Sequence, residues 1–120
     1  MVATAAVREM ARQLDSTGAV IGTDADGTVV YWNRAAEELY GWRSAEAMGR
    51  DILELTPSTM SKREGAEIMR ALLAGKSWSG PFMCRDRNGQ PLIVYVEDTP
   101  VIVDGHVVGI VGVSRLIGVG

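Results

Sequence analysis

Cysteine and histidine are almost absent from this sequence, and their scarcity excludes several kinds of site. Cys84 is the only cysteine, so the chain can form no internal disulfide and no zinc site built from cysteines. His106 is the only histidine, so a Ser-His-Asp or Cys-His catalytic arrangement would have to use it. It follows a turn glycine, which favours a surface histidine over a catalytic one. A single thiol fits a reducing compartment, and we expect a cytoplasmic location.

Long apolar runs and blocks of like charge are also missing. The longest wholly apolar or glycine run, 107–113, is far shorter than the roughly 18 residues that a membrane span needs. Arg8, Glu9 and Arg12 interrupt the N-terminal stretch, which therefore does not read as a signal peptide. The 12 basic and 15 acidic residues give a net charge of −3 without a basic stripe. We expect neither a nucleic-acid nor a membrane partner.

Length and patterning describe one domain of the α+β class. The 120 residues are 47% hydrophobic and 22% charged, which is ordinary for a single folded core. Apolar spacing and capping residues predict helices over 2–14, 34–40, 44–48 and 62–74. Runs rich in β-branched and aromatic residues, bounded by Asx-Gly turns, predict strands over 19–24, 28–32, 78–85, 92–97 and 106–114. We expect a five-stranded antiparallel sheet with short helices on one face, preceded by an N-terminal amphipathic helix.

No motif in the sequence points strongly to catalysis. Walker and dinucleotide-binding fingerprints are absent, because the C-terminal glycines have neither the required spacing nor a following helix. Residues 24–27 resemble the start of a calcium loop, but Ala35 stands where a bidentate glutamate is needed, so we predict a turn. Cys84 has no basic cluster on its own strand face, which favours a buried, inert thiol. We expect no enzyme; a small enzyme with Asp98 or Asp51 as the base is the catalytic alternative.

Several segments together carry a family resemblance. Residues 19–33 read Ala-Val-Ile-Gly-Thr-Asp-Ala-Asp-Gly-Thr-Val-Val-Tyr-Trp-Asn and lead into 34–42 and Met48-Gly-Arg50. The matching segments of the second half are 75–80, 85–90, 99–100 and 108–112. Their order and spacing resemble a PAS domain over about residues 17 to 115. The resemblance implies an antiparallel sheet with helices around a small cavity, in a sensory and dimerisation module of a larger signalling protein.

The resemblance also narrows the cofactors. In the flavin-binding light sensors of this family, the cysteine that attacks the flavin lies just after a Gly-Arg pair. Here Gly49-Arg50-Asp51 is followed by Ile52, so we expect no covalent flavin photoadduct. In the haem-binding oxygen sensors the iron ligand is a histidine on the long helix, and 58–74 contains none, so we expect no histidine-ligated haem. A non-covalent flavin or a small apolar metabolite stays open.

Strand alternation then assigns a candidate ligand cavity. If Ile21 and Thr23 point toward the helices, as their counterparts in the family do, alternate residues of the last three strands, Gly112 among them, point the same way. The candidate cavity-lining residues are Ile21, Thr23, Leu39, Ile52, Met69, Cys84, Val94, Val96, Ile110 and Ser114. Such a mainly apolar set is typical of a small-molecule site. The alternative is that these side chains, Leu39, Ile52 and Met69 among them, simply fill a core.

The other face of the last strand is apolar as well. Val107, Val111 and Val113 point away from the helices, and a strand that is apolar on both sides needs cover on both. The N-terminal helix offers a matching stripe, which consists of Ala3, Val7, Met10 and Leu14. We predict a parallel homodimer through this helix and the outer sheet face. The alternative is a helix that covers only its own sheet.

The chain thus divides into a helix over 1–16, a PAS-like domain over 17–116 and a loose tail over 117–120. Its end, Gly112 to Gly118, lacks the acidic residue and threonine with which many members finish. We expect a module excised from a larger protein, such as a kinase, a cyclic-dinucleotide enzyme or a transcription regulator, whose output domain would be its partner. The predicted function is small-molecule or redox sensing by population shift. A ligand-free dimerisation module is the nearest alternative.

Overall fold

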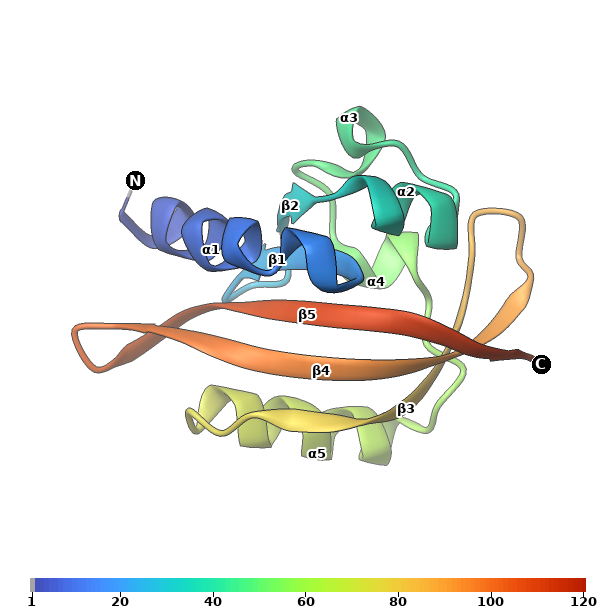
Figure 1. Cartoon of the computed structure of the whole chain (residues 1–120). Coiled ribbons are helices and arrows are strands. Elements are labelled where there is room, and N and C mark those ends of the chain that lie inside the picture. The colour runs from blue at the N-terminus through green and yellow to red at the C-terminus, as the bar shows by residue number, and fades with distance from the viewer. Residues whose placement is uncertain (1) are drawn as a thin grey trace.

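A computed structural model of the chain, which describes residues 2–120, shows an antiparallel sheet with helices on both faces (Figure 1). The strand order is β2-β1-β5-β4-β3. The strands are β1 (Ala19–Asp24), β2 (Val29–Trp32), β3 (Trp78–Arg85), β4 (Pro91–Val103) and β5 (His106–Val119). The helices are α1 (Val2–Gln13), the 3-10 turn η1 (Asp15–Thr17), α2 (Arg34–Tyr40), α3 (Ser44–Ala47), α4 (Ile52–Leu55) and α5 (Lys62–Leu73). The predicted fold class is therefore confirmed.

The two faces of the sheet have separate cores. Figure 1 shows α1 and α5 on opposite sides of β4 and β5. We call the face toward α2–α5 the inner face and the face toward α1 the outer face. The buried residues of the inner core come from β1 to β4 and from α2 to α4, and those of the outer core come from α1, β1, β4 and β5. Within residues 2–120, no helix combines the length and the apolar character needed to cross a membrane.

One buried side chain, Asn33, fixes the start of α2 and holds it to the sheet. Its Oδ1 accepts hydrogen bonds from the backbone N–H groups of Ala36 and Val20, both at 2.9 Å. Its Nδ2 donates to the carbonyl oxygens of Asp15 and Gly18. Because the predicted N-cap also bonds to β1 and to the segment before it, α2 is held in a defined position over the inner face.

The starts of α4 and α5 are both capped, but the sequence pattern predicts only one of them. Ser61 and Glu64 form the predicted capping box of α5. The segment before Pro57, expected to be irregular, contains α4, in which Asp51 Oδ1 accepts a hydrogen bond from the backbone N–H of Leu53 at 2.9 Å. A helix of one turn has too few residues to show an apolar period, so only its cap could have indicated it.

The long helix α5 turns a narrow face toward the sheet. Ile68 and Leu72, one turn apart, are buried as predicted. Met69 and Leu73, which the predicted stripe also includes, are 40% and 53% exposed. Each lies one residue, or about 100°, further around the helix than the buried position before it. Contact with only one side of α5 therefore leaves both outside the packed core.

Strands β4 and β5 run well beyond the predicted ranges. Val119 pairs with Leu92, and the backbone N–H of Gly120 donates to the carbonyl oxygen of Pro91 at 3.1 Å. This corrects the prediction of a loose tail over 117–120. The tail is ordered because β4 begins at Pro91, soon after its turn, and presents unpaired backbone groups that the end of β5 satisfies.

On the outer face, α1 approaches the sheet closely because two facing strands carry glycine. Val7 is fully buried over Gly22 of β1 and Gly109 of β5. A β-carbon at position 22 would lie 2.8 Å from Val7 Cγ1, and one at position 109 would lie 2.5 Å from Val7 Cγ2. Any other residue at either position would push α1 away from the sheet. Within this single chain, the N-terminal helix therefore packs on its own sheet, and the predicted homodimer stays a prediction.

Only some of the residues predicted for the outer face pack at the contact between α1 and the sheet. Val111 is fully buried and Val113 packs beside it, together with Met10 of α1 and Leu14, which follows α1. Val107 does not join them; a β-bulge between Val101 and Ile102 shifts the register near the hairpin end, and Val108 packs there instead. Ala3 is half-buried outside this cluster.

Replacing Gly109 by alanine should destabilise the fold. The added β-carbon would lie 2.2 Å from the Thr23 carbonyl oxygen as well as against Val7, so the free energy of unfolding should fall by about 1–3 kcal/mol or more. Urea unfolding measures the change. Gly65→Ala is the control: its β-carbon would meet nothing within 4 Å, and helix propensity should raise stability by about 0.5–1 kcal/mol. Equal midpoints for Gly109→Ala and the wild type would contradict the close contact.

Candidate functional site

A cavity of about 320 Å³ lies between the inner face of the sheet and helices α4 and α5. Strands β1, β3, β4 and β5 form its floor, because the register places alternate residues of each strand on the inner face. Its lining includes most of the predicted residues, namely Ile21, Thr23, Ile52, Met69, Cys84, Val96, Ile110 and Ser114. Gly112 also lines it, as alternation predicts.

Two predicted residues, Leu39 and Val94, do not line the cavity. Val94 is fully buried in the inner core, and Leu39 packs against the same core. On α2 it is the next residue, Tyr40, that faces the cavity. On β4, Val94 shares the inner face with Val96 but lies further toward the start of the strand, where buried side chains fill the space.

The strand pattern alone misses part of the lining. The further apolar and aromatic residues are Tyr40, Leu53, Ile68, Leu72 and Phe82, and the further polar ones include Thr56, Ser58 and Asp98. The helical stripe of α5 predicts that Ile68 and Leu72 are buried, yet no sequence signal separates a side chain that fills a core from one that borders an empty space. Asp98 is detectable by register, because it stands two residues after Val96 on β4.

The cavity contains a hydrogen-bonded hydroxyl pair and a thiol. Tyr40 Oη lies 2.8 Å from Ser114 Oγ, and both residues are buried. Burial raises the pKa of the Tyr40 hydroxyl well above its ordinary value. Burial, with a smaller contribution from the charge of Asp86, raises the pKa of Cys84 to about 11. Both groups are therefore neutral at physiological pH, and the thiol is a poor nucleophile, as the sequence predicts.

Asp98 is half-buried and contributes a carboxyl group to the cavity lining. Desolvation by burial raises its pKa from 3.8 to about 7. Asp98 stands opposite Gly112 on β5, and a β-carbon at that glycine would lie 2.5 Å from Asp98 Oδ1. Glycine at position 112 therefore gives the carboxyl the space to lie against β5. The other residue proposed as a base, Asp51, is exposed and caps α4.

The lining does not fit a flavin nucleotide. A nucleotide phosphate needs Lys, Arg or a set of backbone N–H donors nearby. Among residues 2–120, those that line the cavity include no Lys, Arg or His, and they include four carboxyl groups, those of Asp24, Asp26, Asp51 and Asp98. Ile52, the residue after Gly49-Arg50-Asp51, lines the cavity.

His106 lies exposed at the β4–β5 turn, where its Nδ1 lies 2.9 Å from the Asp104 carbonyl oxygen.

Comparison with known proteins gives a consistent result. The sequence model of the family described as PAS fold matches residues 7–117. A PAS domain from Colwellia psychrerythraea superposes with a TM-score of 0.78 at 23% identity, over 92% of this chain and 95% of that one. A fungal LOV domain photoreceptor superposes with a TM-score of 0.71 at 25% identity, over 87% of this chain and 77% of that one.

A longer relative also matches in sequence. It is a probable serine/threonine-protein kinase of Dictyostelium discoideum, 30% identical over 91 residues, which are 72% of this chain. The chain spans 6% of the length of that kinase.

Replacing Asp98 by asparagine should remove a pH-dependent loss of stability. Folding raises the pKa of Asp98 from 3.8 to about 7. At pH values between these two, the Asp98 carboxyl is therefore mainly protonated in the folded chain and mainly ionised in the unfolded chain. The free energy of unfolding of the wild type therefore falls, through this group, as the pH rises from about 4 to 7, by at most about 4 kcal/mol. Asp98→Asn should match the wild type near pH 4 and exceed it near pH 8 in urea unfolding.

The comparison between the two proteins isolates Asp98. Tyr40 and Cys84, the other buried titratable groups of the cavity, have raised pKa values and stay neutral over this range. The carboxyls of Asp24, Asp26 and Asp51 are common to both proteins. If both lose the same stability between the two pH values, the Asp98 carboxyl is not buried as described.

Proposed function

Because this chain belongs to the PAS fold family, whose domains serve as sensory modules in signalling proteins, we propose that it senses a small molecule bound in the inner-face cavity. The observation that carries the proposal is the cavity itself. Its volume of about 320 Å³ falls in the range of small-molecule sites, about 300–1,000 Å³. Its lining is mainly apolar with a few polar groups, which is the composition that binds and orients a small ligand.

The same strands that line the cavity also carry α1. On β5, Ile110 and Ser114 face the cavity, while Val111 lies in the outer core against α1. On β1, Ile21 faces the cavity, while Gly22 lies under Val7. A ligand that changes the position of β1 or β5 therefore changes the surface on which α1 rests. We propose that binding shifts the population of α1 positions and that this shift is the output.

We propose that the output acts on another domain of a longer protein. The similar kinase of Dictyostelium discoideum supports this proposal, because the segment that matches this chain is a small portion of a much longer protein. We propose binding rather than catalysis, because the Tyr40–Ser114 hydroxyl pair is neutral and the Asp98 carboxyl has no partner among residues 2–120. Neither supplies the paired acid and base that a small enzyme would need.

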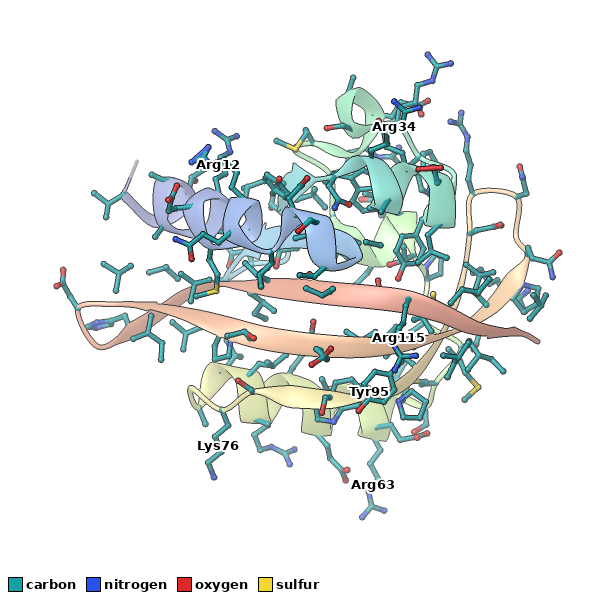
Figure 2. The ribbon with its side chains drawn as sticks, viewed as in Figure 1. Arg12, Arg34, Arg63, Lys76, Tyr95 and Arg115 are labelled. Atoms are coloured by element: carbon teal, nitrogen blue, oxygen red, sulfur yellow. The ribbon has the colours of Figure 1, made fainter. Side chains whose placement is uncertain are left out.

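A second candidate is a dimerisation module, and the outer face favours it. Beyond α1, the side chains of Met83 on β3 and of Ile93 and Tyr95 on β4 lie outside the outer core, and Met83 is 43% exposed. Figure 2 shows Arg115 beside Tyr95. The guanidinium of Arg115 lies over the Tyr95 ring, 5.0 Å from the ring centroid. A second copy would cover this surface, whereas Val7 and Val111 are already buried within one chain. In this candidate, two copies would meet through this surface without exchange of α1.

One native mass spectrum tests both candidates. The full chain is purified without denaturation and weighed, and the denatured sample is searched for a released small molecule. We expect a reproducible mass increase that disappears on denaturation, which supports the sensor. A ligand-free dimer would instead favour the dimerisation module, and a ligand-free monomer that also binds no added small molecule would count against both.

A further inference from the structure

Every charged side chain that lines the cavity, among the residues that the structure describes, carries a carboxyl group. The carboxyl groups of Asp24, Asp26, Asp51 and Asp98 line it, and no lining residue within 2–120 carries a positive charge. Basic side chains of α5 and the following turn point away from the sheet, as Figure 2 shows for Arg63 and Lys76. An anion would therefore enter against four negative groups with no cation to receive it, and a cation would be attracted.

The four carboxyl groups occupy two positions. Asp26 and Asp51 are exposed and mark the open end. There, Asp24 Oδ1 accepts hydrogen bonds from the backbone N–H groups of Asp26 and Thr28, at 2.9 and 3.0 Å, so this carboxylate is held in place. Asp98 stands on β4, is half-buried, and lines the cavity. A cation drawn in at the open end would thus meet a second carboxyl inside.

Asp98 lacks a partner within the described chain. Among residues 2–120, no hydrogen bond or ion pair reaches its carboxyl group, and desolvation alone accounts for its raised pKa. Asp98 is half-buried, and a carboxylate that has lost part of its hydration without gaining a donor is less stable than one in water. The cost persists here because Gly112 opens the space that the carboxyl occupies, while its neighbours on the inner face, such as Val96 and Ile110, are apolar. A ligand that donates a hydrogen bond at this position would relieve the cost.

We propose that the cavity binds a small apolar amine whose protonated nitrogen donates a hydrogen bond to the Asp98 carboxylate. The apolar part would lie among Ile21, Ile68, Leu72 and Ile110, which line the cavity. This inference rests on the proposed sensory function and specifies the chemical class of its ligand. The carboxyl groups at the open end also attract a protonated amine, so the same positive charge favours both entry into the cavity and binding to Asp98.

Two probes of equal size test the assignment. 2-Phenylethylamine is protonated at neutral pH, and 2-phenylethanol has the same shape without the charge. In isothermal titration at about pH 8, where Asp98 is mainly ionised, we expect the amine to bind the wild type at least about tenfold more tightly than the alcohol, because charge-assisted hydrogen bonds contribute more than neutral ones. Asp98→Asn should abolish this preference and leave alcohol binding unchanged.

The control variant is Glu97→Gln. Glu97 is the neighbour of Asp98 on the same strand, but it is exposed and paired with Val113 of the outer core. The Glu97→Gln variant loses the same charge as Asp98→Asn, but residue 97 does not line the cavity, so amine binding should stay at the wild-type affinity. Asp98→Asn removes a partly desolvated charge that has no partner among residues 2–120 and should fold at least as stably as the wild type.

The outcomes separate this inference from the function on which it rests. Equal binding of amine and alcohol, survival of the preference in Asp98→Asn, or an equal loss in Glu97→Gln would each overturn the role of Asp98. In the first of these cases the cavity still binds small molecules and the sensory function stands. If neither probe binds the wild type and native mass spectrometry finds no ligand, both proposals fail.

Discussion

The contact of Val7 with Gly22 and Gly109 determines the arrangement of the rest of the structure. Strand β5 is apolar on both faces, and it can lie in the middle of the sheet only if each face is covered. Val7 of α1, fully buried in the space that the two glycines leave, provides the cover on the outer face. Because α1 covers the outer face within one chain, the shorter helices and α5 cover the inner face.

The inner face combines firm packing with an empty space. At one end, Asn33 fixes α2, and the buried side chains of the inner core fill the region around Val94. At the other end, α5 contributes only Ile68 and Leu72 as buried side chains and leaves a cavity beside β4 and β5. Asp98 is tolerated there because the cavity, rather than packed protein, lies next to its carboxyl. The same feature that weakens packing thus creates a site with one unpartnered charge.

Much of this architecture could be predicted from the sequence. Asx-Gly turns, the Asn33 cap and the Ser61 capping box marked the main elements, and period-two alternation from Ile21 placed Cys84, Val96 and Ser114 on the correct face. Three features could not be predicted because they depend on how segments pair and pack in three dimensions, which the alternation and capping patterns do not specify. The bulge that displaces Val107 is one, the pairing that orders the C-terminal residues is another, and the selection of Tyr40 over Leu39 by the helix orientation is the third.

The central claim is that one sheet connects a ligand cavity on its inner face to α1 on its outer face. Hydrogen–deuterium exchange of the full chain, measured with and without saturating 2-phenylethylamine, tests it most directly. The account predicts altered exchange in α1 (Val2–Gln13) together with β1 and β5, although α1 lies on the face opposite the cavity. Altered exchange confined to the inner face, with α1 unchanged, would contradict it.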